Sequence, residues 1–106
     1  MTADIVPSDL HDRVVAYFDP RQVILFGSRA RGQARSDSDI DLLVILDDDA
    51  PPAMRTLKAG YESRRGYHRA ADVIPVRDSV YRKRTQIAGN LAYEAARDGV
   101  MVYERV

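Results

Sequence analysis

The sequence has no cysteine, no tryptophan and no excess of charge of either sign. Without cysteine there is no disulfide framework, no thiolate metal site and no thiol nucleophile, so the fold must be stabilised by packing of its hydrophobic residues, which make up 45% of the chain. The 16 basic and 16 acidic side chains cancel, which leaves no net field that would gather a polyanion. We therefore expect no direct binding to nucleic acid.

The sequence also lacks the segments that carry a protein into or across a membrane. The longest apolar run, from Leu42 to Leu46, is far too short to span a bilayer, and Met1 is not followed by a basic stretch and then an apolar one. We expect a cytoplasmic protein with no membrane partner. A chain of 106 residues fits one domain, residues 1–106, and leaves no room for a second domain that would grip a substrate.

Hydrophobic periodicity predicts a single mixed α/β (α+β) domain in which a sheet of about four strands packs with helices. The predicted strands are 22–26, 39–46, 71–76 and 100–103. The predicted helices are about 9–18 with Ser8 as the cap, a segment from 54 to 66, a basic segment at 79–85, and one around 91–96 that ends at Gly99. Pro75 indicates that the third strand lies at an edge of the sheet or ends there, because proline cannot donate a ladder hydrogen bond.

One apolar stripe of the second predicted helix has two interpretations. Met54, Leu57 and Tyr61 recur at helical spacing, and a stripe of this kind most often faces the core. We interpret it as core, with contact to a partner protein as the alternative.

Two neighbouring segments join a glycine-serine turn to a pair of carboxylates. They read Leu25-Phe26-Gly27-Ser28-Arg29-Ala30-Arg31-Gly32 and Ser38-Asp39-Ile40-Asp41-Leu42-Leu43-Val44. Because side chains alternate along a strand, Asp39 and Asp41 should share one face, while the apolar residues between them fill the core behind the other. Two adjacent carboxylates suit Mg²⁺, which prefers one or two such ligands together with water and substrate phosphates.

The residues around this pair suit transfer of a nucleotidyl group from a nucleoside triphosphate. Gly27 lets the backbone approach the β and γ phosphates, and the Ser28 hydroxyl and the amides that follow can donate to them. Arg29 and Arg31 add positive charge nearby. Asp72, on the next predicted strand, is the best candidate for a third carboxylate that completes a two-metal site, with ions about 3.5 to 4 Å apart, and helps to deprotonate the acceptor hydroxyl.

Simpler interpretations remain open for these residues. The Gly27-Ser28 pair could be only a strand-to-helix turn in which Ser28 caps the helix. Asp72 could be a charge at the rim, paired with Arg69 or Arg77. The acidic run 47–49 follows the second predicted strand at the end opposite Asp39, so we interpret it as a solvated loop and leave it out of the site.

The sequence resembles the minimal nucleotidyltransferases of the DNA polymerase β-like superfamily. The pattern of that family is a hydrophobic residue, Gly-Ser, a spacer and Asp-hydrophobic-Asp-hydrophobic, and it is met here by Phe26-Gly27-Ser28, the spacer 29–38, and Asp39-Ile40-Asp41-Leu42. The shortness of the chain makes it similar to the antitoxins of HEPN/MNT toxin-antitoxin pairs.

This resemblance implies an activity and a partner. It implies use of ATP and Mg²⁺ to attach AMP to a tyrosine of a HEPN ribonuclease toxin, which would silence the toxin. Two alternatives to this activity are an antitoxin that blocks its partner sterically without turnover, and nucleotidyl transfer to a small molecule in a pocket completed by a dimer.

Overall fold

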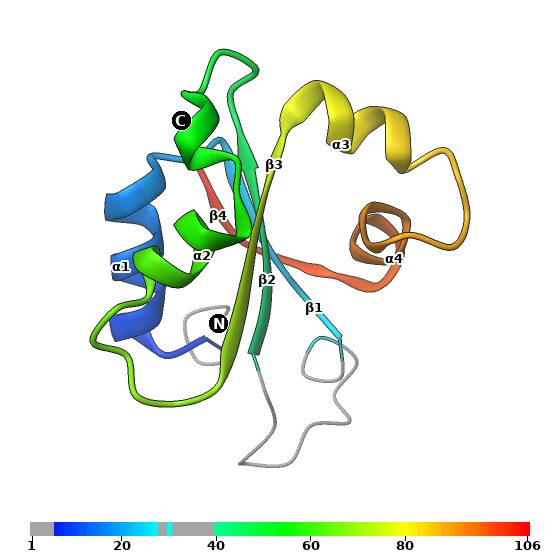
Figure 1. Ribbon diagram of the computed structural model, residues 1–106. Helices are drawn as coiled ribbons and strands as arrows, with labels where there is room; N and C mark the ends of the chain where they lie inside the picture. The colour runs from blue at the N-terminus through cyan, green and yellow to red at the C-terminus, as the bar shows by residue number, and fades with distance from the viewer. Residues whose placement is uncertain (1–5, 28–29, 31–39) are drawn as a thin grey trace.

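The computed structural model describes residues 6–27, 30 and 40–106, and in these ranges a four-stranded sheet is covered by helices on both faces (Figure 1). The strands are β1 (Gln22–Phe26), β2 (Ile40–Leu46), β3 (Ala71–Arg77) and β4 (Val100–Glu104), arranged in the order β3-β2-β1-β4. β1 is antiparallel to β2 and β4, whereas β2 is parallel to β3. The sheet is therefore mixed, and the predicted fold class is confirmed.

The first face of the sheet is covered by α1 (Ser8–Phe18) and α2 (Leu57–Ser63), and the short 3₁₀ helix η2 (Pro52–Met54) precedes α2. The main core lies there, because alternate strand residues point to this side. Its fully buried side chains include Leu10, Val14, Leu25, Leu42 and Val44. The prediction that Ser8 caps α1 is wrong: Pro7 holds the cap position and Ser8 is the first helical residue.

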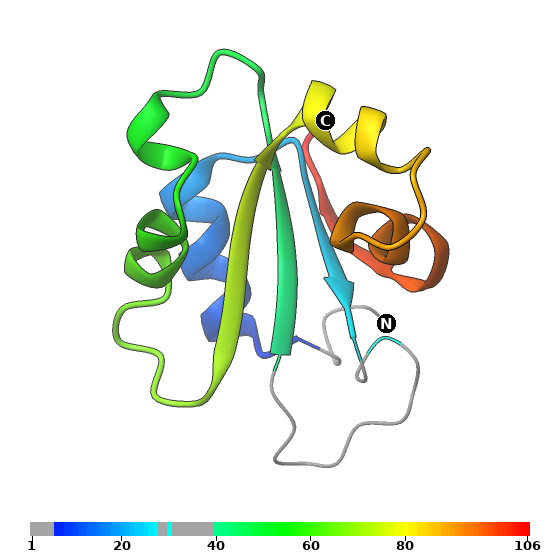
Figure 2. The same ribbon diagram turned by 45° about the vertical axis from the view of Figure 1, so that its right-hand side comes forward.

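The second face carries α3 (Asp78–Arg84) and α4 (Leu91–Asp98), which lie on the opposite side of the sheet from α1 and α2 (Figure 2). A smaller core forms there from Ile24, Phe26, Leu43, Ile45 and Ala95. Gly99 ends α4, as predicted, and the chain then enters β4 at the far edge from β3. No helix in the described part of the chain is long and apolar enough to cross a bilayer.

The interpretation of the predicted stripe Met54, Leu57 and Tyr61 as core is wrong for two of its three residues. Leu57 is 71% exposed and Tyr61 is 61% exposed, and only Met54 packs against the main core. The helix instead buries small residues, and a Cβ at Gly60 would collide with the backbone carbonyl of Val73. Because α2 approaches the β3 backbone through this glycine, its large apolar side chains are turned outward.

Candidate active site

Asp41 and Asp72 are neighbours on the second face of the sheet. Asp41 is the register partner of Phe26 on β1 and of Asp72 on β3, so the three residues form one row across three strands. The next row on the same face is apolar and contains Ile24, Leu43 and Ile74. Since neighbouring strands are about 4.8 Å apart, the two carboxylates can reach a common ligand.

The row of carboxylates lies at the end of the sheet where β1 finishes and β2 and β3 begin. Asp41 is the second residue of β2 and is half-buried, while Asp72 is the second residue of β3 and is exposed. Parallel pairing of β2 with β3 brings these equivalent positions together. The structure thus joins two of the three predicted acids, which are 31 positions apart in the sequence.

Gly27 brings the turn after β1 against the Asp41 carboxylate. Its φ angle is +79°, a left-handed conformation that favours glycine, and a Cβ built on it would lie 2.5 Å from Asp41 Oδ2. The φ angle favours glycine at this position, and any Cβ there would force the Asp41 carboxylate or the turn to shift. The sequence predicted a glycine for close approach of phosphates, and the described structure adds that the missing side chain leaves space for a site carboxylate.

The remaining predicted site residues lie outside the described residues. These are Ser28, Arg29, Arg31 and Asp39. Their roles in binding phosphate or metal stay predictions, and the site is built here from Gly27, Asp41 and Asp72.

The described residues fit a magnesium ion that is shared with a phosphate. Within the described ranges no three histidine, cysteine, aspartate or glutamate side chains gather to hold a metal. Asp41 and Asp72 nevertheless supply two hard oxygen ligands at one register position, and Mg²⁺ commonly takes only one or two protein carboxylates. When bound, Mg²⁺ would act as a Lewis acid on phosphoryl oxygens.

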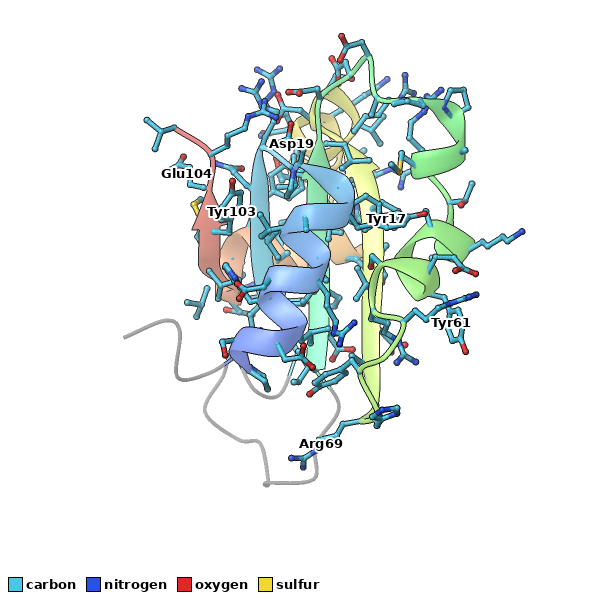
Figure 3. All side chains as sticks on the ribbon, turned by 90° about the vertical axis from the view of Figure 1, so that its left-hand side faces the viewer. Tyr17, Asp19, Tyr61, Arg69, Tyr103 and Glu104 are labelled. Carbon is cyan, nitrogen blue, oxygen red and sulfur yellow. The ribbon has the colours of Figure 1, made fainter. Side chains whose placement is uncertain are left out.

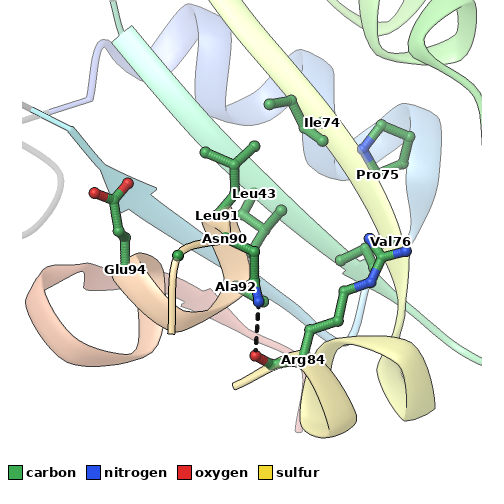
Figure 4. Close-up of a pocket in the computed structure, with 10 residues that line it drawn as sticks. Leu43, Ile74, Pro75, Val76, Arg84, Asn90, Leu91, Ala92 and Glu94 are labelled. Carbon is green, nitrogen blue, oxygen red and sulfur yellow. Dashed lines mark hydrogen bonds between the residues drawn. The ribbon is translucent and has the colours of Figure 1, made fainter. Parts of the chain in front are cut away.

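A cavity of about 500 Å³ lies further along the same face, between β3 and α4 (Figure 4). Leu43 and Ile74, two residues beyond Asp41 and Asp72 on their strands, form part of its wall. On the α4 side, the Asn90 amide donates to the backbone carbonyl of Arg84, which fixes the turn between α3 and α4. The sequence did not predict this cavity. Leu43 and Ile74 appear in the sequence only as apolar strand residues, which are equally typical of a filled core.

The acidic run 47–49 lies at the other end of β2, as predicted, but two of its members have structural partners. The Arg105 guanidinium donates two hydrogen bonds to Asp47, at 2.8 and 2.9 Å, and this contact lowers the pKa of the carboxyl below its ordinary value. Asp48 accepts a hydrogen bond from the backbone N–H of Ser79, which lowers its pKa in the same way. These acids attach the chain end and the start of α3 to the sheet.

Comparison with known proteins agrees with this geometry. The sequence matches the family described as polymerase beta, nucleotidyltransferase, over residues 9–106. The chain belongs to this family. A search of curated proteins finds no match to the sequence.

Three solved structures share the nucleotidyltransferase fold with this chain. A toxin-antitoxin crystallised with AMP-PNP has a TM-score of 0.60 and 15% identity, over 94% of this chain and 75% of its own. A candidate nucleotidyltransferase from Sulfolobus solfataricus has a TM-score of 0.59 and 22% identity, over 92% and 76%. A mutant of the toxin-antitoxin MntA-HpeT with two aspartate-to-glutamate substitutions has a TM-score of 0.58 and 14% identity, over 94% of this chain and 75% of its own. At these identities the likeness shows the fold alone.

Proposed function

We propose that this nucleotidyltransferase is a Mg²⁺-dependent adenylyltransferase that transfers AMP from ATP to a hydroxyl, in particular a tyrosine hydroxyl, of a partner HEPN ribonuclease toxin. Transfer would neutralise the toxin, so the protein would act as an antitoxin. The observation that carries the proposal is the register pair of Asp41 and Asp72 beside the Gly27 turn. That the similar structures include a toxin-antitoxin crystallised with AMP-PNP supports the class of partner and of nucleotide.

In the proposed reaction the acceptor oxygen forms a bond to the α-phosphorus of ATP. The bond from that phosphorus to the oxygen bridging to the β-phosphate breaks, and pyrophosphate leaves. Asp41, in the middle strand of the row, and Asp39 would hold the Mg²⁺ ion, which would supply the positive charge that attracts the α-phosphate. Asp72 would orient the acceptor hydroxyl and receive its proton directly or through water.

The residues next to the carboxylates would hold the rest of the nucleotide. The backbone at Gly27 has no side chain to obstruct the triphosphate, and Ser28, Arg29 and Arg31 would donate to its oxygens or balance its charge. Pyrophosphate would leave from this side of the site. The proposed roles therefore place the leaving group beside β1 and the acceptor beside β3.

Labelled ATP distinguishes this reaction from other uses of the same site. The full-length chain is incubated with Mg²⁺, the partner protein that co-purifies with it, and ATP labelled either at the α- or at the γ-phosphate. Only the label of α-labelled ATP should enter the partner, and the Asp41→Asn variant should not transfer it. Transfer from γ-labelled ATP would indicate a kinase, and neutralisation of the partner by Asp41→Asn without any label would indicate steric blocking.

A further inference from the structure

A groove between α2 and β3 borders the edge strand that carries Asp72 of the proposed active site. Its walls are Leu57, Tyr61 and Arg64 on the α2 side and residues 71–74 of β3, and its volume is about 290 Å³. We call it the α2–β3 groove. Asp72 is one of its lining residues, so a molecule bound in the groove would lie beside the edge-strand residue that is proposed to receive the acceptor proton.

The α2 wall of the groove is apolar and exposed. Leu57 and Tyr61 are four residues apart on one face of the helix and are 71% and 61% exposed. Tyr61 projects from the outer side of α2 (Figure 3), and the Arg64 guanidinium lies 5.1 Å from the centre of its ring. This cation–π contact favours one position of the ring, so the wall is partly organised before anything binds.

The order of the strands indicates that the acceptor hydroxyl approaches from the β3 side of the site. In an in-line displacement the attacking and leaving oxygens lie on opposite sides of the phosphorus. Gly27 follows β1, Asp41 lies in β2, which is between β1 and β3, and Asp72 lies in the edge strand β3. With pyrophosphate leaving beside the Gly27 turn, the acceptor must attack from the β3 side, where the groove is.

We propose that the α2–β3 groove docks the segment of the partner protein that carries the acceptor hydroxyl. This inference rests on the proposed function. The occupant is an extended peptide segment with an apolar side chain, aliphatic or aromatic, close to the hydroxyl residue. That side chain packs against Leu57 and Tyr61, and the hydroxyl residue passes over the exposed edge of β3 to reach Asp72 on the second face of the sheet.

The lining of the groove favours a peptide over other occupants. Nucleic acid would need several cations along its backbone, whereas Arg64 is the one cationic side chain among the lining residues. A stable dimer needs about 800 Å² from each partner, far more than a groove of this size offers. One or two side chains of a peptide fit a volume of about 290 Å³.

Exposed-residue variants test the groove without disturbing the core. Leu57→Glu and Tyr61→Ser should raise the KM for the partner roughly tenfold or more, because the apolar contact is lost. Their ATP affinity, measured by calorimetry, and their thermal midpoint should stay at the wild-type values. Ile87→Glu is the matched control: Ile87 is 55% exposed and does not line the groove, so its KM should be unchanged.

Failure of this inference can be told apart from failure of the proposed function. Transfer by wild type with an unchanged KM in both variants would overturn the groove and leave the adenylyltransferase intact. If wild type transfers nothing, a benzophenone side chain in place of Tyr61 decides: a crosslink to the partner supports the docking surface, and a crosslink to a second copy of this chain, or none, overturns it.

Discussion

Replacing Gly27 with alanine tests the contact between the turn and the Asp41 carboxylate. The φ angle of +79° alone costs roughly 1–2 kcal/mol for a residue with a Cβ. The new Cβ would also lie 2.5 Å from Asp41 Oδ2, about 0.9 Å inside the ordinary contact limit of 3.4 Å. The carboxylate or the turn must therefore move, and a displacement of about 1 Å in an active site can reduce the rate about 100-fold.

Gly89→Ala separates these two effects. Gly89 has a φ of +95°, and no heavy atom lies within 4 Å of the position that its Cβ would occupy. Both variants should lose roughly 1–2 kcal/mol in the free energy of unfolding measured with urea. Only Gly27→Ala should also lose transfer, measured as single-turnover incorporation of AMP well below the thermal midpoint. Equal rates for the two variants would refute the argument that the missing side chain leaves space for Asp41.

Three further predictions concern the metal, the packing of α2 and the acidic run. Chelation of divalent cations should stop AMP transfer and added Mg²⁺ should restore it; transfer that persists with excess chelator would contradict the carboxylate assignment. Gly60→Ala should destabilise the fold by about 1–3 kcal/mol, because its Cβ would meet the Val73 carbonyl, and an unchanged urea midpoint would contradict that packing. Because folding lowers the pKa of Asp47, the stability advantage of wild type over Asp47→Asn should be complete above the ordinary value of 3.8 and disappear as pH falls through the lower folded value; a pH-independent difference in urea midpoints would be the opposite result.

The strands and two of the site acids could be predicted from the sequence. Runs of strand-forming residues fix β1 and β3 closely, and the alternation around Asp41 predicts which side of β2 is polar. The meeting of Asp41 with Asp72 follows once β2 and β3 are neighbours. The local pattern is visible in the sequence, whereas the strand order β3-β2-β1-β4 that joins the two acids is shown only by the structure.

The orientation of α2 could not be predicted, because it depends on a contact between distant backbone segments. Helical spacing placed Leu57 and Tyr61 on one face, but the face that packs is decided by Gly60, which approaches the β3 carbonyl at Val73. The approach of Gly27 to Asp41 is likewise a tertiary contact across β1 and β2. In both cases the sequence shows a glycine, but only the structure shows which atoms lie where its side chain would be.

The intact mass of the partner protein tests the central claim most directly. The co-purified partner is incubated with ATP, Mg²⁺ and either the wild-type chain or Asp41→Asn. Our account predicts that the wild type adds one or more AMP units to the partner and that Asp41→Asn reduces the rate at least about 100-fold. The reason is that Asp41 is proposed to hold the Mg²⁺ ion, whose stabilisation of charge on the reacting phosphate is worth several kcal/mol. An unmodified partner with the wild type, or the same adduct at the same rate with Asp41→Asn, would contradict it.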